Sequence, residues 1–188
     1  QHVNYWIHAQ HLLADGAKMA KSAGNVFLIE ELIERGFSAL SFRYLCMTVR
    51  YRHRMNFTFT SLKAAEKALT NLRQRIWLWN QDPADGGQAT KYASEIEEYQ
   101  RRFWGAVESD LDLPSALSLT WEMVRSELPP RTKMDLLLEF DEIFGLDLDK
   151  AQNENAVAEG ITTTVKVRGI HREQSDYATA DSIRGQLA

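Results

Sequence analysis

The chain has 188 residues, of which 44% are hydrophobic, so it is long enough to bury the core of one or two globular domains. No apolar run approaches the roughly 20 residues that a membrane-spanning helix requires. Cys46 is the single cysteine, which excludes an intrachain disulfide and a cysteine-rich metal site and suits a reducing cytosol.

The formal net charge of −4 is unevenly distributed along the chain. Residues 1–80 carry 11 Lys and Arg against 5 Asp and Glu, a net charge of +6. Residues 81–188 carry 11 against 21, a net charge of −10. Because basic segments attract polyphosphates and nucleic acids, we expect the surface that meets a polyanion to lie in the first half.

The first third of the chain is predicted to contain short elements. Residues 3–13 fit a strand or an interfacial helix, and periodicity does not decide between them. A helix predicted over 28–35 ends at Gly36, since glycine favours the left-handed backbone found after helix C-termini. Ser38 is a typical N-cap for the next helix, predicted from Ala39 to about Tyr51, in which Cys46 is expected to be buried.

A long helix is predicted to start at Thr60 or Ser61. Its apolar residues alternate three and four apart, which is typical of the buried side of a packed helix. These residues are Leu62, Ala65, Leu69, Leu72, Ile76 and Trp79. Residues 81–88, which contain a proline and two glycines, are predicted to form a loop.

The second half is predicted to be mainly helical. A helix over 89–109 is followed by one with Pro114 in its first turn, where the missing N–H costs nothing. A further helix over 131–144 follows Pro129-Pro130 and ends at Gly145. Residues 147–160 read as a linker or the start of a frayed helix, Thr162 to Val165 locally favour a strand, and Ser175 can cap a last helix.

The stretch from Gly16 to Asn25 carries the strongest functional signal. It reads Gly-Ala-Lys-Met-Ala-Lys-Ser-Ala-Gly-Asn, with Lys18 and Lys21 three residues apart among small residues. Small side chains let the backbone approach a ligand, and two ammonium groups can reach one polyanion such as a triphosphate. The alternative is a lysine-bearing surface turn.

This loop resembles the KMSKS motif of class I aminoacyl-tRNA synthetases, with Ala20 where that family usually has serine. The flanking Tyr5-Trp6-Ile7-His8 and Arg50-Tyr51-Arg52 resemble cysteinyl-tRNA synthetases in particular. Segments similar to that family follow in its order at residues 110–117, 140–146 and 168–184. The resemblance therefore covers nearly the whole chain.

The resemblance implies a mainly α fold, with helix also at residues 162–165 despite their local strand preference. It implies a helical bundle of the anticodon-binding type, attached to the C-terminal tail of a class I α/β catalytic domain. Residues 1–36 would end the catalytic domain, 37–88 would form connecting helices, and 89–188 would form a DALR-type helical tRNA-binding domain. The family's HIGH motif, nucleotide-binding strands and zinc ligands are not found here, so we expect a C-terminal piece of a longer enzyme.

The implied activity is ATP-dependent ligation of cysteine to tRNA-Cys in the cytoplasm. The implied partners are tRNA-Cys, cysteine and ATP with Mg, for a monomeric enzyme that binds neither membrane nor DNA. Zinc is expected in the intact enzyme, with its ligands outside this chain. One alternative is the related cysteine–aminosugar-inositol ligase of mycothiol synthesis, against which the segment from Asp176 to Arg184 argues. The other is a non-catalytic RNA-binding or structural module.

The resemblance also assigns roles within the loop. Lys21 would hold the ATP phosphates, and Lys18 would assist as pyrophosphate leaves, so both are candidate catalytic residues. The candidate ATP-binding residues are Lys18, Met19, Ala20, Lys21 and Ser22. Met19 is better suited to packing the loop against the protein than to chemistry. No metal site is predicted, because His8 and His11 lack two further ligands.

The densest basic cluster consists of Arg50, Arg52, His53 and Arg54, and the three arginines are the candidate tRNA-binding residues. One interpretation is contact with tRNA phosphates. The other is a solvated helix end, where cations are favoured by the helix dipole. Asp110 and Asp112 resemble the start of a structural helix in the family and are not interpreted as a general acid–base pair.

Overall fold

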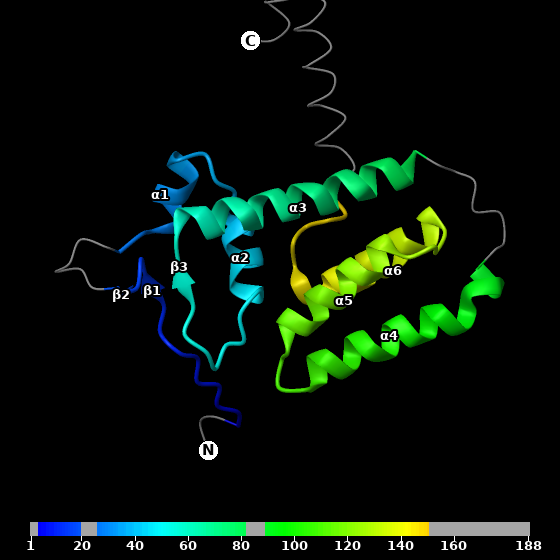
Figure 1. The fold of residues 1–188 in the computed structure, drawn as a ribbon, viewed down its shortest axis with the longest axis horizontal. Coiled ribbons are helices and arrows are strands. Elements are labelled where there is room, and N and C mark those ends of the chain that lie inside the picture. Colours follow the sequence, from blue (N-terminus) through cyan, green and yellow to red (C-terminus); the bar gives the residue numbers. More distant parts are fainter. Residues whose placement is uncertain (1–3, 20–25, 82–88, 151–188) are drawn as a thin grey trace, which may run out of the picture.

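The computed structural model describes residues 4–19, 26–81 and 89–150, which form a helical bundle with a small sheet at one end (Figure 1). The helices are α1 (Ile29–Glu34), α2 (Ala39–Met47), α3 (Phe59–Asn80), α4 (Ala93–Glu108), α5 (Leu113–Arg125) and α6 (Pro130–Phe144). A short 3-10 helix, Ala89–Tyr92, precedes α4. The strands are β1 (Leu13–Ala14), β2 (Ala17–Lys18) and β3 (Asn56–Phe57). The predicted mainly α fold is confirmed.

Helix α3 is the longest element and runs past both the sheet end and the bundle (Figure 1). All six residues of its predicted apolar side are buried. The helix begins earlier than predicted, because Thr58 is the N-cap. The Thr58 hydroxyl accepts a hydrogen bond from the Ser61 N–H at 3.0 Å, and the Ser61 hydroxyl accepts one from the Thr58 N–H at 3.1 Å. This reciprocal cap fixes the start of α3 directly after β3.

The bundle core lies between α3, α4, α5 and α6. The ring of Phe103 on α4 stacks on Phe140 of α6, with centroids 3.9 Å apart and planes 4° apart. Phe144 meets Phe103 edge-on at 5.4 Å. All three rings are fully buried, and burial of such large side chains is a major source of stability in a helical bundle.

Helix α2 connects the sheet end to the bundle. The Trp121 indole N–H of α5 donates to the Tyr44 hydroxyl at 2.8 Å, and the Arg43 Nε donates to the Phe144 carbonyl at 2.5 Å. Its predicted N-cap is confirmed, since the Ser38 hydroxyl accepts from the Leu40 N–H. Gly36 and Gly145 also end helices as predicted, both with positive φ.

Two further predicted helix boundaries are wrong. The predicted helix over 39–51 ends at Met47, because the chain turns over residues 50–53 and the Tyr51 carbonyl accepts from the Gln10 N–H at 2.9 Å. The predicted helix over 89–109 starts as α-helix only at residue 93, after the 3-10 turn. Apolar periodicity continues through both boundaries and therefore did not reveal them.

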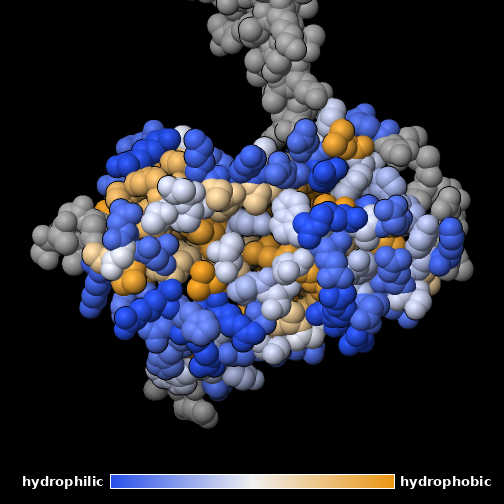
Figure 2. Space-filling view, in the orientation of Figure 1, coloured by the Kyte–Doolittle hydropathy of each residue, from blue (hydrophilic) through white to orange (hydrophobic). Residues whose placement is uncertain are grey.

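Several sequence predictions lie outside the described residues. These are the loop within 82–88 and everything predicted beyond residue 150. Within the described ranges, no helix has the length and apolar character needed to cross a membrane. Figure 2 shows a largely hydrophilic surface, on which hydrophobic atoms are visible mainly toward the end with α1 and in the middle of the face.

Candidate functional site: a lysine hairpin and an arginine–aspartate junction

The first lysine of the loop lies on a tight β-hairpin. Strands β1 and β2 pair antiparallel, with Leu13 opposite Lys18 and Ala14 opposite Ala17. The two residues between the strands, Asp15 and Gly16, have φ of 49° and 80°. Positive φ at both positions is typical of a type I′ turn, for which Asp-Gly is a preferred sequence. The Asp-Gly pair is therefore a local signal from which the hairpin could have been predicted.

The hairpin is held by β3. Strands β1 and β3 pair in parallel, and the Leu13 N–H donates to the Met55 carbonyl at 2.8 Å. The Asp15 N–H donates to the Phe57 carbonyl at 3.0 Å. The Gly16 N–H donates to the Asn56 side-chain oxygen at 2.7 Å. The turn that leads to Lys18 is thus fixed by a residue 40 positions further along the chain.

The structure places the first two candidate residues of the loop. Lys18 is exposed at the end of β2, and Met19 is half-buried in an apolar hollow of about 100 Å³ with Phe27, Leu32 and Phe57. This position supports the packing role predicted for Met19. Ala20, Lys21 and Ser22 lie outside the described residues, so their predicted roles are not tested.

The arginine cluster meets two aspartates from the turn between α4 and α5. The Arg52 guanidinium donates to both oxygens of Asp110, at 2.6 and 2.9 Å, and the Tyr51 hydroxyl donates to the same carboxylate at 2.5 Å. Arg50 pairs with Asp112. We call these five residues the Arg–Asp junction. Sequence reasoning did not pair them, because partners 58 to 62 residues apart leave no local pattern.

The junction perturbs its acidic groups strongly. Hydrogen bonds from Arg52 and Tyr51 lower the pKa of Asp110 to about 2. Burial acts to raise the pKa of Asp112, but hydrogen bonds from Ser115 and the charge of Arg50 prevail and lower it. The hydrogen bond to Asp110 raises the pKa of the Tyr51 hydroxyl. Both carboxylates are therefore anionic near neutral pH and oppose the charge of the two arginines.

The aspartates also shape the turn that carries them. Asp110 and Leu111 have φ of 56° and 52°, a conformation that non-glycine residues rarely adopt. Asp112 is the N-cap of α5, because its carboxylate accepts from the Ser115 N–H at 3.4 Å and from the Ser115 hydroxyl at 2.7 Å. The interpretation of this segment as the start of a structural helix is confirmed.

Arg54 differs from the other two arginines of the cluster. It is exposed, and within the part of the chain that the structure describes it has no hydrogen bond or ion pair. Helix α2 ends at residue 47, so none of the three arginines lies in its last turn. The helix-end explanation is therefore wrong, whereas contact with RNA stays a prediction.

Cys46 is exposed, contrary to the prediction that it is buried. It lines an open, mainly apolar hollow of about 320 Å³ beside Phe42, Val49 and Met55. These surroundings raise the pKa of its thiol, which keeps the thiol protonated near neutral pH. In residues 4–19, 26–81 and 89–150, no three His, Cys, Asp or Glu side chains are grouped so that they could hold a metal ion.

Comparison with known proteins gives a match to one family model. Residues 1–67, which include the lysine hairpin, α1, α2 and the first part of α3, match the family model of the class I (C) tRNA synthetase catalytic domain. The Arg–Asp junction therefore connects the matched region with helices that lie beyond it.

The individual relatives are cysteine–tRNA ligases. The chain is 37% identical to cysteine–tRNA ligase 1 of Burkholderia lata, with all of the chain and 38% of the relative covered. It is 36% identical to the enzyme of Borrelia garinii subsp. bavariensis, covering 97% of the chain and 41% of the relative. The enzyme of Opitutus terrae is 34% identical, with 100% and 39% covered.

The chain thus spans about two fifths of the length of the curated relatives that it matches, in their C-terminal part. The predicted resemblance is confirmed: the chain is related to the cysteinyl-tRNA synthetases.

Proposed function

We propose that this chain supplies the ATP-phosphate loop and the tRNA-binding helices of a cysteine–tRNA ligase. The observation that carries the proposal is the similarity to cysteine–tRNA ligases along the whole chain, at 37% identity in one case. The lysine loop lies within the part that matches the catalytic domain. Because the relatives are longer than this chain, the activity belongs to a protein that also contains the rest of that domain.

The proposed reaction has two steps. The cysteine carboxylate attacks the α-phosphate of ATP and pyrophosphate leaves, after which the cysteinyl group is esterified to the terminal ribose of tRNA-Cys. Lys18 and Lys21 donate to the phosphates as negative charge passes to the leaving pyrophosphate. Magnesium, when bound with ATP, would add further positive charge there. The zinc that the resemblance implies for the intact enzyme would be held by ligands outside this chain.

The described part of the loop supports separate roles for Lys18, Met19 and Lys21. The type I′ turn and its bond to Asn56 hold Lys18 at the end of β2. Met19 packs into the apolar hollow and would limit how far the loop can move from the protein surface. Lys21 would then extend from a loop whose entry is fixed. Ala20 lacks a hydroxyl, which removes one possible hydrogen bond within the loop.

The remaining assignments are part of the same proposal. Residues 1–36 would form the end of the catalytic domain, and residues 37–88 would form the helices that connect it to the next domain. Residues 89–188 would form the helical domain that binds tRNA, in a cytoplasmic, monomeric enzyme. Arg54 is the better candidate for RNA contact, because the charges of Arg50 and Arg52 already face Asp110 and Asp112. The comparisons give no support to the aminosugar-inositol ligase.

The test uses the whole enzyme with cysteine, ATP and tRNA-Cys. We expect cysteine-dependent ATP–pyrophosphate exchange followed by charging of the tRNA. Exchange without charging would favour the aminosugar-inositol ligase, and the absence of both would favour a non-catalytic module. Arg54→Ala is expected to raise the KM for tRNA while pyrophosphate exchange stays unchanged. Lys63→Ala is the control, because Lys63 is an exposed cation of α3 outside the residues proposed to bind tRNA.

A further inference from the structure

The segment of residues 50–57, which we call the connector, lies between the lysine hairpin and the α4–α5 turn. On the hairpin side, its carbonyls at Tyr51, Met55 and Phe57 accept from the N–H groups of Gln10, Leu13 and Asp15, at 2.9, 2.8 and 3.0 Å. On the other side, Arg50 binds Asp112, and Tyr51 and Arg52 bind Asp110. The connector is therefore bonded along both of its sides.

Asp110 is the main partner of the connector on the side that faces the α4–α5 turn. Its carboxylate receives three hydrogen bonds from the connector, at 2.5, 2.6 and 2.9 Å. The turn that presents it is closed by bonds from the Leu111 N–H to the Val107 carbonyl and from the Asp112 N–H to the Ala106 carbonyl, at 3.1 and 3.0 Å. Two residues of this turn have left-handed backbone conformations, which persist only where the surrounding contacts hold them.

We propose that Arg52 and Asp110 are positioning residues: through the connector, the α4–α5 turn sets where the lysine hairpin lies. The route runs from Asp110 through Arg52 and Tyr51 to the backbone of Gln10, and through Asn56 to the turn at Gly16. That the positioned hairpin serves ATP rests on the proposed function. Helices that would carry tRNA and the loop that would carry ATP are thereby mechanically linked.

The first test measures amide hydrogen exchange in the 188-residue chain. Asp110→Asn removes the charge but keeps a residue that tolerates left-handed backbone. We expect exchange at Gln10, Leu13 and Gly16 to become about two- to fivefold faster, the range of a single exposed ion pair. Arg52→Gln should accelerate exchange at the same amides by a similar factor. Arg52→Lys should accelerate it less, because lysine keeps the charge without the bidentate geometry.

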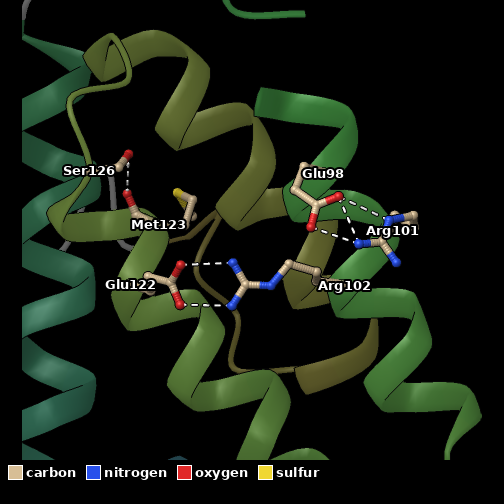
Figure 3. A network of polar contacts seen from close by, with 6 residues as sticks. All are labelled: Glu98, Arg101, Arg102, Glu122, Met123 and Ser126. Atoms are coloured by element: carbon tan, nitrogen blue, oxygen red, sulfur yellow. Dashed lines mark hydrogen bonds and ion pairs between the residues drawn. The ribbon is translucent and has the colours of Figure 1, made fainter. Parts of the chain in front are cut away.

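The matched control is Arg102→Gln. Arg102 of α4 makes a bidentate pair with Glu122 of α5, at 2.8 and 2.9 Å, without touching the connector (Figure 3). It should leave exchange at the hairpin unchanged. The proposal is overturned if Asp110→Asn leaves the hairpin amides unchanged, or if it accelerates the α3 core amides of Leu69 and Leu72 by the same factor, which would indicate general destabilisation.

The second test uses the whole enzyme and separates this proposal from the proposed function. Asp110→Asn should lower kcat/KM for ATP in pyrophosphate exchange by a similar factor of about two to five, whereas Arg102→Gln should not. If only the first test succeeds, the hairpin is positioned as described but the link to ATP is wrong. If the unsubstituted enzyme shows no ATP–pyrophosphate exchange, the proposed function fails. The hydrogen-exchange result on the hairpin amides would still stand.

Discussion

At the scale of single residues, the role of a charged side chain depends on the partner that it contacts. Arg50, Arg52 and Arg54 are equivalent in the sequence, yet the structure pairs the first two with Asp112 and Asp110 and leaves the third exposed. A bidentate guanidinium–carboxylate pair specifies geometry as well as charge. Two arginines of the cluster therefore fix the connector to the α4–α5 turn, and one faces solvent.

The depressed pKa of Asp110 predicts a pH dependence of stability. The folded-state value is about 2, below the ordinary 3.8, so the carboxylate binds its proton less readily when the protein is folded. Its contribution to the free energy of unfolding is complete above about pH 4 and is lost as the pH falls toward about 2. Urea unfolding should show that Asp110→Asn is less stable than the unsubstituted chain at about pH 6, and that the difference disappears near pH 2. An equal difference at both pH values would contradict this assignment.

Local signals predicted part of the site and missed the rest. The spacing of Lys18 and Lys21, and the resemblance around it, predicted the candidate loop from the sequence alone. Asp15-Gly16 is a turn signal from which the hairpin could also have been predicted. Asn56, Asp110 and Asp112 could not be connected to their partners, because each acts over 40 or more residues of separation. Only the folded chain brings such groups together.

At the scale of elements, the helix ends follow local chemistry, but their exact positions depend on tertiary contacts. The buried side of α3 matches the apolar spacing residue for residue, because a packed helix must repeat every three to four positions. Helix α2 ends early where the connector bonds to Gln10. Apolar spacing alone would have continued it through Val49.

Substitution by alanine is expected to have opposite effects on stability at two glycines, Gly145 and Gly105. Gly145 has φ of 58°, and a Cβ there would lie 2.9 Å from Nη2 of Arg43, so Gly145→Ala should destabilise the chain by about 1–2 kcal/mol. Gly105 lies inside α4, and a Cβ there would meet nothing within 4 Å, so Gly105→Ala should stabilise the chain by about 0.5–1 kcal/mol. Denaturant unfolding measures both. Equal effects of the two substitutions would show that backbone conformation is not what distinguishes them.

At the scale of the whole molecule, three links within the described residues join the loop region to the bundle. The first is α3, which begins in the part that matches the catalytic domain and continues beyond it. The second is the Arg–Asp junction, which reaches the α4–α5 turn. The third is α2, whose Tyr44 and Arg43 bond to Trp121 and Phe144 of the bundle. Several separate links resist rotation better than α3 alone, because a single helix would leave the bundle free to turn about its axis. This arrangement suits a protein in which RNA and ATP would have to be held in one geometry.

The central claim is that the paired lysines grip the phosphates of ATP, and steady-state ATP–pyrophosphate exchange by the whole enzyme tests it most directly. Lys21→Ala should lower kcat/KM for ATP by about tenfold to a hundredfold, the effect of losing one charge-assisted hydrogen bond in the transition state. Lys18→Ala should also lower it, and Lys63→Ala on the exposed face of α3 should leave it unchanged. Full exchange activity in Lys21→Ala would contradict the account.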